Sequence, residues 1–390
     1  MASTKSDKAL YSVKTDASSA SRVSKSADVF VASGIKAICE VGIDHISVSQ
    51  VTALANSTRP TFYSQFGGVE GLCADIWLAY GSWFLRNVAD PGFRFEVSDP
   101  GTQAKMLALL EIFTVSHRVA EIAEVVEPTV ASWWKQSTQP NAYSQLKLSW
   151  LVGQRLGSWL TFPIEPKALL AGFAAPIITN LGDKARSTGL PVKQLKLPPL
   201  KDPKIADGSV ENQLLDSAIR VIARVGVEKA SMTRISRNAQ VTTGAVYPRF
   251  KNHDELILAS FARAIESVVE ENFAQIKPEG FSPDDFGLVT TAGLLQDRKT
   301  WRNFRVEMHL AARLNRKLAE NIRTALAITN ERVGVGLGLL PISKTEREAV
   351  AFLVHAIGIG LAMLLNSGVP VDELDHRIIT RDMIEDLGKR

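Results

Sequence analysis

One segment of this chain occurs twice, and the repeat limits the folds that the chain can adopt. Residues 33–72 align without a gap with residues 217–256, a displacement of 184 residues. Weaker similarity continues beyond each copy at displacements of 192 and 205, a growth that inserted loops would produce. Because 390 residues are also long for a single core, the sequence predicts two modules built on one plan. Identical residues meet at Ser33 and Ser217, Val41 and Val225, Gly42 and Gly226, Ser47 and Ser231, Ala55 and Ala239, Thr58 and Thr242, Tyr63 and Tyr247, Phe66 and Phe250, and Leu72 and Leu256.

Each copy has the apolar spacing of helices, and no segment shows sustained strand alternation. In the second copy, apolar residues from Leu215 to Ile222 share one face of a first helix. A second, a third and a fourth helix follow. The third helix is very short and the fourth is long. The chain is therefore predicted to be all-α. The boundary residues in this copy are a C-cap at Gly226, N-caps at Ser231 and Thr242, and a capping box of Asn252 with Glu255.

The first copy repeats these signals. Ser47 and Gln50 have the spacing of a capping box, and Thr58 is the predicted cap of the third helix. Pro60 lies within the first turn of that helix, where proline is tolerated. Two short helices joined by a tight turn and packed on a third helix form a helix-turn-helix.

The short third helix of the second copy carries two kinds of residue. Val246 and Phe250 are four positions apart and belong to a core, whereas Tyr247 lies on a different face. Residues 242–245 are small. A helix N-terminus with small side chains and free backbone N–H groups can approach a phosphate closely, and a recognition helix contacts base edges from its N-terminal residues.

Both copies resemble the helix-turn-helix of the tetracycline-repressor (TetR) family of bacterial transcriptional regulators. The resemblance covers about fifty residues in each copy, and beyond them the chain resembles the family only in being helical. It implies a small DNA-binding domain followed by a larger helical sensor domain, which usually binds a small molecule and dimerises through its last helices. The matching pattern in the second copy is Gly226, Ser231-Met232, Ile235, Ala239, Val241-Thr242, Gly244, Tyr247, Phe250 and Glu255-Leu256.

The resemblance implies a DNA-contacting surface on each helix-turn-helix. A threonine methyl can meet a thymine methyl, and a tyrosine hydroxyl can reach a phosphate. In the second copy the predicted DNA-binding residues are Ser231, Thr233, Arg234, Thr242, Thr243, Gly244, Ala245, Tyr247, Arg249, Lys251 and His253. In the first copy they are Ser47, Thr58, Arg59, Thr61 and Tyr63.

Both copies depart from the family pattern. A glycine that is usual in the turn between the helices is Asn56 in one copy and Gln240 in the other, and asparagine tolerates a left-handed backbone better than glutamine. A lysine that is usual near the start of the fourth helix is Val69 in the first copy and His253 in the second. Because that lysine would contact phosphate, its absence weakens the case for DNA binding, especially in the first copy.

Charge separates the two copies further. Between Glu211 and His253, seven basic residues oppose three acidic ones, a net charge of +4. Between Ala27 and Val69, two basic residues oppose three acidic ones, a net charge of −1. Phosphate contacts supply most of the non-specific affinity for DNA. The second copy is therefore expected to bind DNA more strongly, while the first relies on Arg59 and the basic N-terminal tail or has lost the activity.

The predicted organisation follows from the repeat. It consists of a flexible basic tail (1–26), a first helix-turn-helix domain (27–78), a first helical sensor domain (79–186), a linker (187–209), a second helix-turn-helix domain (210–262) and a second helical sensor domain (263–390). The linker is rich in proline and lysine and lacks helical period. The tail is either a disordered solvated segment or an arm that touches phosphate.

Aromatic residues and histidines of the two predicted sensor domains are candidates for an apolar ligand pocket. The alternative for each of them is packing in a core. His117 and His309 align between the copies, so they either orient a ligand or are hydrogen-bonded core histidines. The candidates are Trp133, Trp150, Trp159, His117, Phe304, His309, His355 and Met363.

Composition narrows the class of protein. With 45% hydrophobic and 22% charged residues the chain is expected to be soluble and globular, and its net charge of +4 is compatible with a nucleic-acid partner. Cys39 and Cys73 form no disulfide framework, which suits the bacterial cytoplasm. The apolar run from Ala349 to Leu365 is slightly short for a bilayer span and predicts a buried helix, with Gly358 and Gly360 allowing close helix packing.

Catalytic and metal-binding signals are weak. The six histidines show no metal-ligand spacing, and no nucleophile and base occur in a pattern that would define an enzyme. The glycine-rich segments are not phosphate loops, because no strand precedes them and no Lys-Ser/Thr follows. Neither catalysis nor a bound cofactor is expected.

The sequence thus predicts a DNA-binding transcriptional regulator, most simply a repressor, that a small apolar effector releases from its operator. The two modules are expected to pack as an intramolecular pseudo-dimer through helices at Tyr143–Phe162 and Ala349–Leu365, and self-association through these helices is a second possibility. Because the two recognition helices differ, the operator should be asymmetric. The alternative is a ligand-binding or interaction protein whose helix-turn-helix units are degenerate.

Overall fold

The computed structural model describes residues 17–138, 141–182, 208–273, 282–337 and 342–387, and within these ranges it contains helices and turns but no strand. The prediction of an all-α chain is confirmed. The first half (residues 17–182) contains α1 (Ala17–Val41), α2 (Val48–Leu54), α3 (Arg59–Phe66), α4 (Val69–Ala89), α5 (Pro100–Val115), α6 (Ala120–Ser137), α7 (Ala142–Thr161) and α8 (Ala174–Asn180), with 3₁₀ turns η1 (Phe95–Val97), η2 (Ser116–Arg118) and η3 (Pro166–Phe173).

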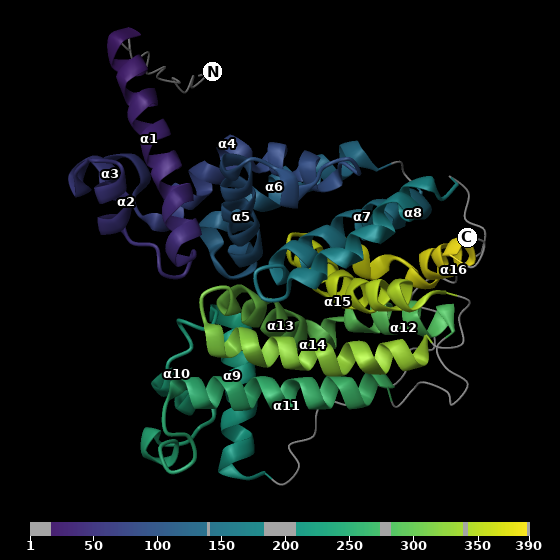
Figure 1. Cartoon of the computed structure of the whole chain (residues 1–390). Helices are drawn as coiled ribbons and strands as arrows, with labels where there is room; N and C mark the ends of the chain where they lie inside the picture. The colour runs from purple at the N-terminus through teal and green to yellow at the C-terminus, as the bar shows by residue number, and fades with distance from the viewer. Residues whose placement is uncertain (1–16, 139–140, 183–207, 274–281, 338–341, 388–390) are drawn as a thin grey trace, which may run out of the picture.

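The second half (residues 208–387) has a similar order of helices. It contains α9 (Val210–Val225), α10 (Met232–Asn238), η5 (Thr243–Ala245), α11 (His253–Phe273), α12 (Pro283–Gly293), η6 (Gln296–Arg298), α13 (Lys299–Ala312), α14 (Arg316–Gly336), α15 (Lys344–Asn366), η7 (Val371–Glu373) and α16 (His376–Leu387). In Figure 1 the helices α1–α3 and α9–α10 lie at the left side of the molecule, and the longer helices of both halves stack to their right.

Most of the predicted helix boundaries are confirmed. Ser47, Thr58 and Ser231 are N-caps whose hydroxyls accept a backbone N–H three residues on. Gly226 ends α9 with a φ of 81°, a left-handed conformation that glycine adopts without strain. These caps are local interactions, and this is why the sequence could place them.

Three details of capping differ from the prediction. Ser47 accepts from the Gln50 backbone, so one half of that capping box is present. The Thr242 side chain does not cap, and the expected third helix of the second copy is the 3₁₀ turn η5 followed by further turns. Asn252 accepts from the Glu255 N–H at 2.9 Å, but the Glu255 carboxylate accepts from the N–H of Lys251 at 2.7 Å, one residue before the expected partner.

Two predicted segments lie partly outside the described residues. Residues 1–16 of the predicted tail and residues 187–207 of the predicted linker are among those not described. Helix α1 begins at Ala17, inside the segment that the sequence predicts as a tail. Ser209, at the end of the predicted linker, is the N-cap of α9.

Helices α7 and α15 pack along each other and join the two halves (Figure 1). A Cβ atom on Gly157 would lie 2.0 Å from the carbonyl oxygen of Ala356, and one on Gly360 would lie 1.8 Å from that of Gly153. The helices can approach so closely only because glycine has no Cβ. The predicted packing role of Gly360 is confirmed, whereas Gly358 makes room for the guanidinium of Arg305 instead of for a neighbouring helix backbone.

The apolar helix α15 is long enough to span a bilayer, and it is the one such helix among the described residues. Most of it is buried against α7, α13, α14 and η3, as the sequence predicts. One apolar core extends through both halves by way of α7 and α15, and a second contains α9, α10, α11, α13 and α14.

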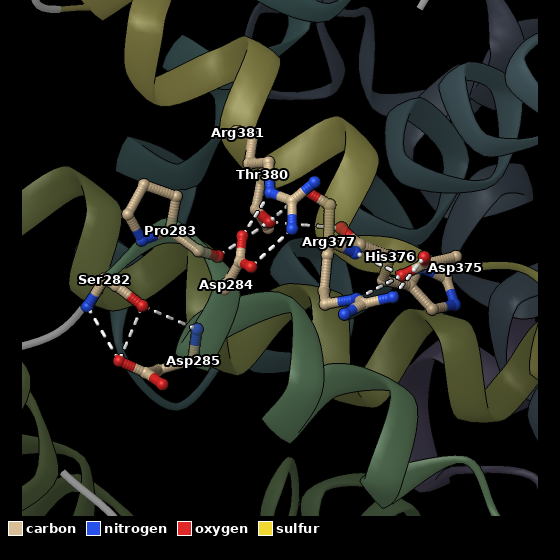
Figure 2. Close-up of polar contacts among 9 residues, drawn as sticks. All are labelled: Ser282, Pro283, Asp284, Asp285, Asp375, His376, Arg377, Thr380 and Arg381. Carbon is tan, nitrogen blue, oxygen red and sulfur yellow. Dashed lines mark hydrogen bonds and ion pairs between the residues drawn. The ribbon is translucent and has the colours of Figure 1, made fainter. Parts of the chain in front are cut away.

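The C-terminal helix α16 connects α12 to the first half. Figure 2 shows the ion pair between Arg381 and Asp284, together with the Thr380 hydroxyl, which donates to the Pro283 carbonyl at 2.8 Å. On its other side α16 accepts two hydrogen bonds from α7. The Tyr143 hydroxyl donates to the Asp382 carboxylate at 2.6 Å, and Trp150 Nε1 donates to His376 Nδ1 at 2.9 Å. Helix α12, which forms part of a cavity wall described below, is thereby held in place.

Candidate nucleic-acid interface and ligand cavity

The second helix-turn-helix (α9, α10 and η5, here the second unit) buries its apolar residues and exposes Tyr247. Val246 and Phe250 are 0% and 3% exposed and pack on α9 and α11. Tyr247 is 59% exposed, although it directly follows a fully buried residue. A large aromatic side chain held at the surface beside small residues is available to a partner outside the chain.

The polar residues predicted to contact DNA are mostly exposed in this unit. Ser231, Thr233, Arg234, Thr242, Gly244, Arg249 and Lys251 are exposed, whereas Thr243, Ala245 and His253 are half-buried. Two guanidinium groups fold back on their own unit. Arg234 donates to the Lys229 carbonyl at 3.0 Å, and Arg249 donates to the Ala245 carbonyl at 2.8 Å.

His253 differs from the other predicted contacts. Its Nε2 donates to the carbonyl of Ala230 at 2.9 Å and ties the start of α11 to the loop between α9 and α10. This bond gives the residue a structural role, which the sequence did not indicate because the partner is 23 residues away.

The turn between the two helices is left-handed in both units. Asn56 has a φ of 46° and Gln240 a φ of 59°, and among the described residues they are the two non-glycine residues with positive φ. These are the positions where the family pattern has glycine. The Val241 N–H donates to the Ser236 carbonyl at 3.0 Å and closes the turn. The backbone therefore keeps its conformation although the side chain adds strain.

We expect Gln240→Gly to raise the free energy of unfolding by about 0.5–1 kcal/mol. A left-handed residue with a Cβ costs roughly 1–2 kcal/mol, and the extra chain entropy of glycine offsets about half of this gain. Urea denaturation measures the difference. Asn56→Gly is the control and should give a smaller gain, because asparagine tolerates this conformation. A loss of stability in Gln240→Gly would mean that the glutamine side chain contributes more than the strain costs.

The first helix-turn-helix (α1–α3, here the first unit) has the same arrangement with fewer cations. Phe62 is fully buried against Phe30 and Phe66, and Tyr63 is 53% exposed. Thr58 and Thr61 share a hydrogen bond of 2.8 Å, and Arg59 donates to the hydroxyl of Ser49. The polar surface is present, but Arg59 is its only basic residue between Ser47 and Val69.

All seven basic residues of the segment 211–253 are exposed. They are Arg220, Arg224, Lys229, Arg234, Arg237, Arg249 and Lys251. The list of predicted contacts omitted Arg237, although it stands on α10 three residues after Arg234, on the same side of the helix. Its spacing is the signal that could have identified it. The second unit therefore presents a positive surface, and the first unit does not.

The second half also contains a cavity of about 220 Å³ among α11, α12, α13, α14 and α15 (here the cavity). Phe304, His309 and His355, three of the residues predicted to bind a ligand, line it. Trp133, Trp150 and Met363 are buried in the core that spans both halves. Trp159 borders a different hollow beside Phe93 and Phe95.

His117 lies at a junction between the two halves instead of in the cavity. Its Nε2 contacts the Glu307 carboxylate at 2.8 Å, and Arg118 Nε donates to the same oxygen at 2.7 Å. Arg118 also donates to Asp44 in the turn after α1, at 2.8 and 2.9 Å. The side chains of Arg118 and Glu307 are 2% and 1% exposed. We call these four residues the junction.

A second connection mirrors the junction. Arg313, which follows α13, donates to the carbonyls of Ile38 and Cys39 at 2.8 Å and pairs with Glu111. The glycine after α1, Gly42, lies against residues 313–314 of the second half, while Gly226 after α9 lies against Arg118 of the first half. Each unit is thus contacted at the end of its first helix by the opposite half. Sequence reasoning missed these contacts, because they join residues up to 275 positions apart.

Comparisons with known proteins agree with this geometry. Residues 214–260 match the family model described as "Bacterial regulatory proteins, tetR family". The HTH-type nicotine-responsive transcriptional repressor HdnoR of Paenarthrobacter nicotinovorans is 46% identical over 57 residues, which cover 15% of this chain and 29% of the relative. The fatty acid metabolism regulator protein of Bacillus subtilis is 27% identical over 77 residues, or 20% of this chain and 40% of the relative.

The chain therefore spans less than half the length of these curated relatives. A transcriptional regulator from Rhodococcus sp. Rha1 has a crystal structure that aligns with 46% of this chain and 97% of its own, at 19% identity and a TM-score of 0.41. The family match falls on the second unit. Residues 214–260 of this chain thus match the family model of the tetR family of bacterial regulatory proteins, and they contain the second unit's short helices and turn.

Proposed function

We propose that the chain is a DNA-binding transcriptional regulator, most simply a repressor, in which the second unit supplies most of the affinity for DNA. The observation that carries this proposal is the exposed Tyr247 within a tetR-family domain whose seven basic residues are all exposed. Phosphate contacts by such cations supply non-specific affinity, and the exposed small residues Thr242 and Gly244 at the start of η5 support an approach to base edges.

The chain holds its two units as an intramolecular pseudo-dimer that arose from a tandem duplication. The packing of α7 on α15 supports this, as does the reciprocal contact of each unit with the opposite half at Gly42 and Gly226. Reciprocal contacts between matching surfaces are typical of two-fold dimers. Because the second unit carries the excess positive charge and the two short helices differ in sequence, the operator is asymmetric.

A small ligand in the cavity releases the protein from DNA through α13. Arg305 and His309 of this helix line the cavity, while Glu307 lies about half a turn away and belongs to the junction. Arg313 at the end of α13 contacts the last carbonyls of α1. A ligand that favours another position of α13 would change the spacing of the two units, and differential affinity then releases DNA.

The test is selection of bound duplexes from a random DNA pool with three proteins: wild type, Tyr247→Ala and Tyr63→Ala. Tyr247→Ala should weaken binding to the enriched site about 10- to 100-fold, because a hydrogen bond to a charged phosphate is lost. The matched variant Tyr63→Ala should have a smaller effect and change only one side of the site. An Arg249→Ala variant should reduce the salt dependence of binding by about one unit of slope.

The second candidate is a ligand-binding or interaction protein whose helix-turn-helix units no longer bind DNA. The net charge of −1 in the first unit favours it. Folded protein that enriches no sequence and binds duplex with almost no salt dependence would support this candidate and reject the regulator.

A further inference from the structure

We propose that the cavity of the second half binds a carboxylate with an apolar body, and that Arg305 is its counter-ion. The inference rests on the proposed role of the cavity as the effector site and names the chemical class of that effector.

The walls favour an apolar body. Aromatic and aliphatic side chains from five helices form most of the lining, among them Phe261, Phe286, Trp301, Phe304, Ile322 and Leu361. Among the described residues that line the cavity there is no aspartate, glutamate or lysine. A cationic ligand would therefore find no partner of opposite charge, and a strongly polar one would leave most of its groups without hydrogen bonds.

Arg305 differs in its partners from several arginines of the interior that meet a carboxylate. Arg118, Arg313 and Arg377 each form an ion pair with an aspartate or glutamate. Among the described residues Arg305 forms none, and its guanidinium donates to the Nδ1 atom and to the carbonyl of His355, at 2.9 and 3.2 Å. Burial lowers the pKa of Arg305 to about 10, so the guanidinium is still charged at neutral pH. An unpaired buried cation beside a cavity favours an anionic ligand.

A second arginine of the cavity is held by backbone carbonyls. Arg302 donates to the carbonyls of Gly293 and Leu295, and burial lowers its pKa to about 10 against the opposing effect of Asp372 and Asp297. These bonds hold the guanidinium at the end of α12, although its buried Nε has no hydrogen-bond partner among the described residues. Because two backbone carbonyls already hold Arg302, Arg305 is the proposed counter-ion.

The two histidines add donors and acceptors with fixed roles. Arg305 donates to Nδ1 of His355, so the proton of this imidazole is on Nε2, and that buried N–H has no hydrogen-bond partner among the described residues. His309 Nδ1 donates to the carbonyl of Arg305 at 2.8 Å, which leaves its buried Nε2 as an acceptor with no partner in the part of the chain that the structure describes. A carboxylate can accept from Arg305 and His355 together, and His309 can accept from a hydroxyl or amide of the ligand.

Both histidines are neutral at physiological pH. Burial, followed by the nearby charge of Arg305, lowers the pKa of His309 to about 3 and that of His355 well below its usual value. The two rings therefore add hydrogen-bonding groups but no charge, and the charges among the described lining residues are those of the arginines Arg298, Arg302 and Arg305. Positive charges beside apolar walls favour an anion such as a carboxylate that carries an apolar body.

The test is isothermal titration calorimetry of the full chain with octanoate, decanoate and phenylbutyrate, each compared with its primary amide. At least one carboxylate should bind about tenfold or more tightly than its amide, because the neutral amide cannot form the same charge-assisted hydrogen bonds with Arg305. Arg305→Met should remove this preference. Equal or tighter binding of the amides, an unchanged preference in Arg305→Met, or no binding of any carboxylate would overturn the inference.

Two further measurements separate the possible failures. Arg316→Met removes one charge from an exposed position on α14 and should leave the preference for carboxylate intact. Arg305→Met should unfold at an equal or higher urea concentration than wild type, because it removes an unpaired buried charge, so lost binding would not reflect unfolding. Duplex binding by the ligand-free chain is measured separately: a chain that binds DNA but prefers amides rejects this inference and keeps the regulator.

Discussion

Arg118→Met is expected to lower the free energy of unfolding by about 3–5 kcal/mol, because it leaves buried charges without a partner. Arg118 is the one cation that joins Asp44 of the first unit to Glu307 of α13, with both contacts at 2.7–2.9 Å. Methionine fills much of the same volume but cannot donate to either carboxylate. Glu307, which is 1% exposed, would keep only His117 as a partner. Urea denaturation of the full chain measures the loss.

Two variants distinguish a lost ion pair from a packing defect. The double variant Arg118→Met with Glu307→Met should recover a large part of the stability, because apolar residues can replace a buried pair at little cost. Lys167→Met is the matched control, since Lys167 and Glu348 also connect the two halves, at 2.9 Å, but both side chains are exposed. It should cause almost no change. A double variant as unstable as the single one would show that the charges at the junction are not the cause.

Gly157→Ala is expected to lower the free energy of unfolding by about 3 kcal/mol, at the upper end of what overpacking costs. The new Cβ would lie 2.0 Å from the Ala356 carbonyl oxygen, which belongs to the backbone of α15 and cannot rotate away. The helices α7 and α15 would have to separate along the contact that joins the two halves. Thermal and urea unfolding should both report the change.

The control for this variant is Gly334→Ala. Gly334 is also helical, in α14, but its Cβ would meet no atom within 4 Å. This substitution should raise stability by about 0.5–1 kcal/mol, because alanine favours the helix. If both variants changed stability in the same direction and by a similar amount, the close approach of α7 and α15 would not be the reason for glycine at position 157.

The candidate site was only partly predictable from sequence. The repeat can be read by aligning the sequence with itself. The helix caps and the exposed position of Tyr247 depend on residues within four positions of each other, so the spacing of apolar residues indicates them directly. The change from an α-helix to the 3₁₀ turn η5 was missed, since the same residue pattern suits either. His253 was assigned to DNA by its position, whereas its bond to Ala230 depends on how α11 meets the loop before α10.

The sequence by itself determined the all-α class and the excess of positive charge between Glu211 and His253, and it predicted two helix-turn-helix units. These properties depend on spacing and composition, so no contact between distant residues is needed to infer them. Only the tertiary structure decided which residues join the halves and which face the cavity. Arg118 and Arg305 are both arginines on apolar helical segments, and one meets two carboxylates while the other meets a histidine. Glu307 lies 189 positions from Arg118 in the chain, and His355 lies 50 positions from Arg305, so the packing of the helices brings each pair together. The surroundings of a buried charge then decide what it can bind.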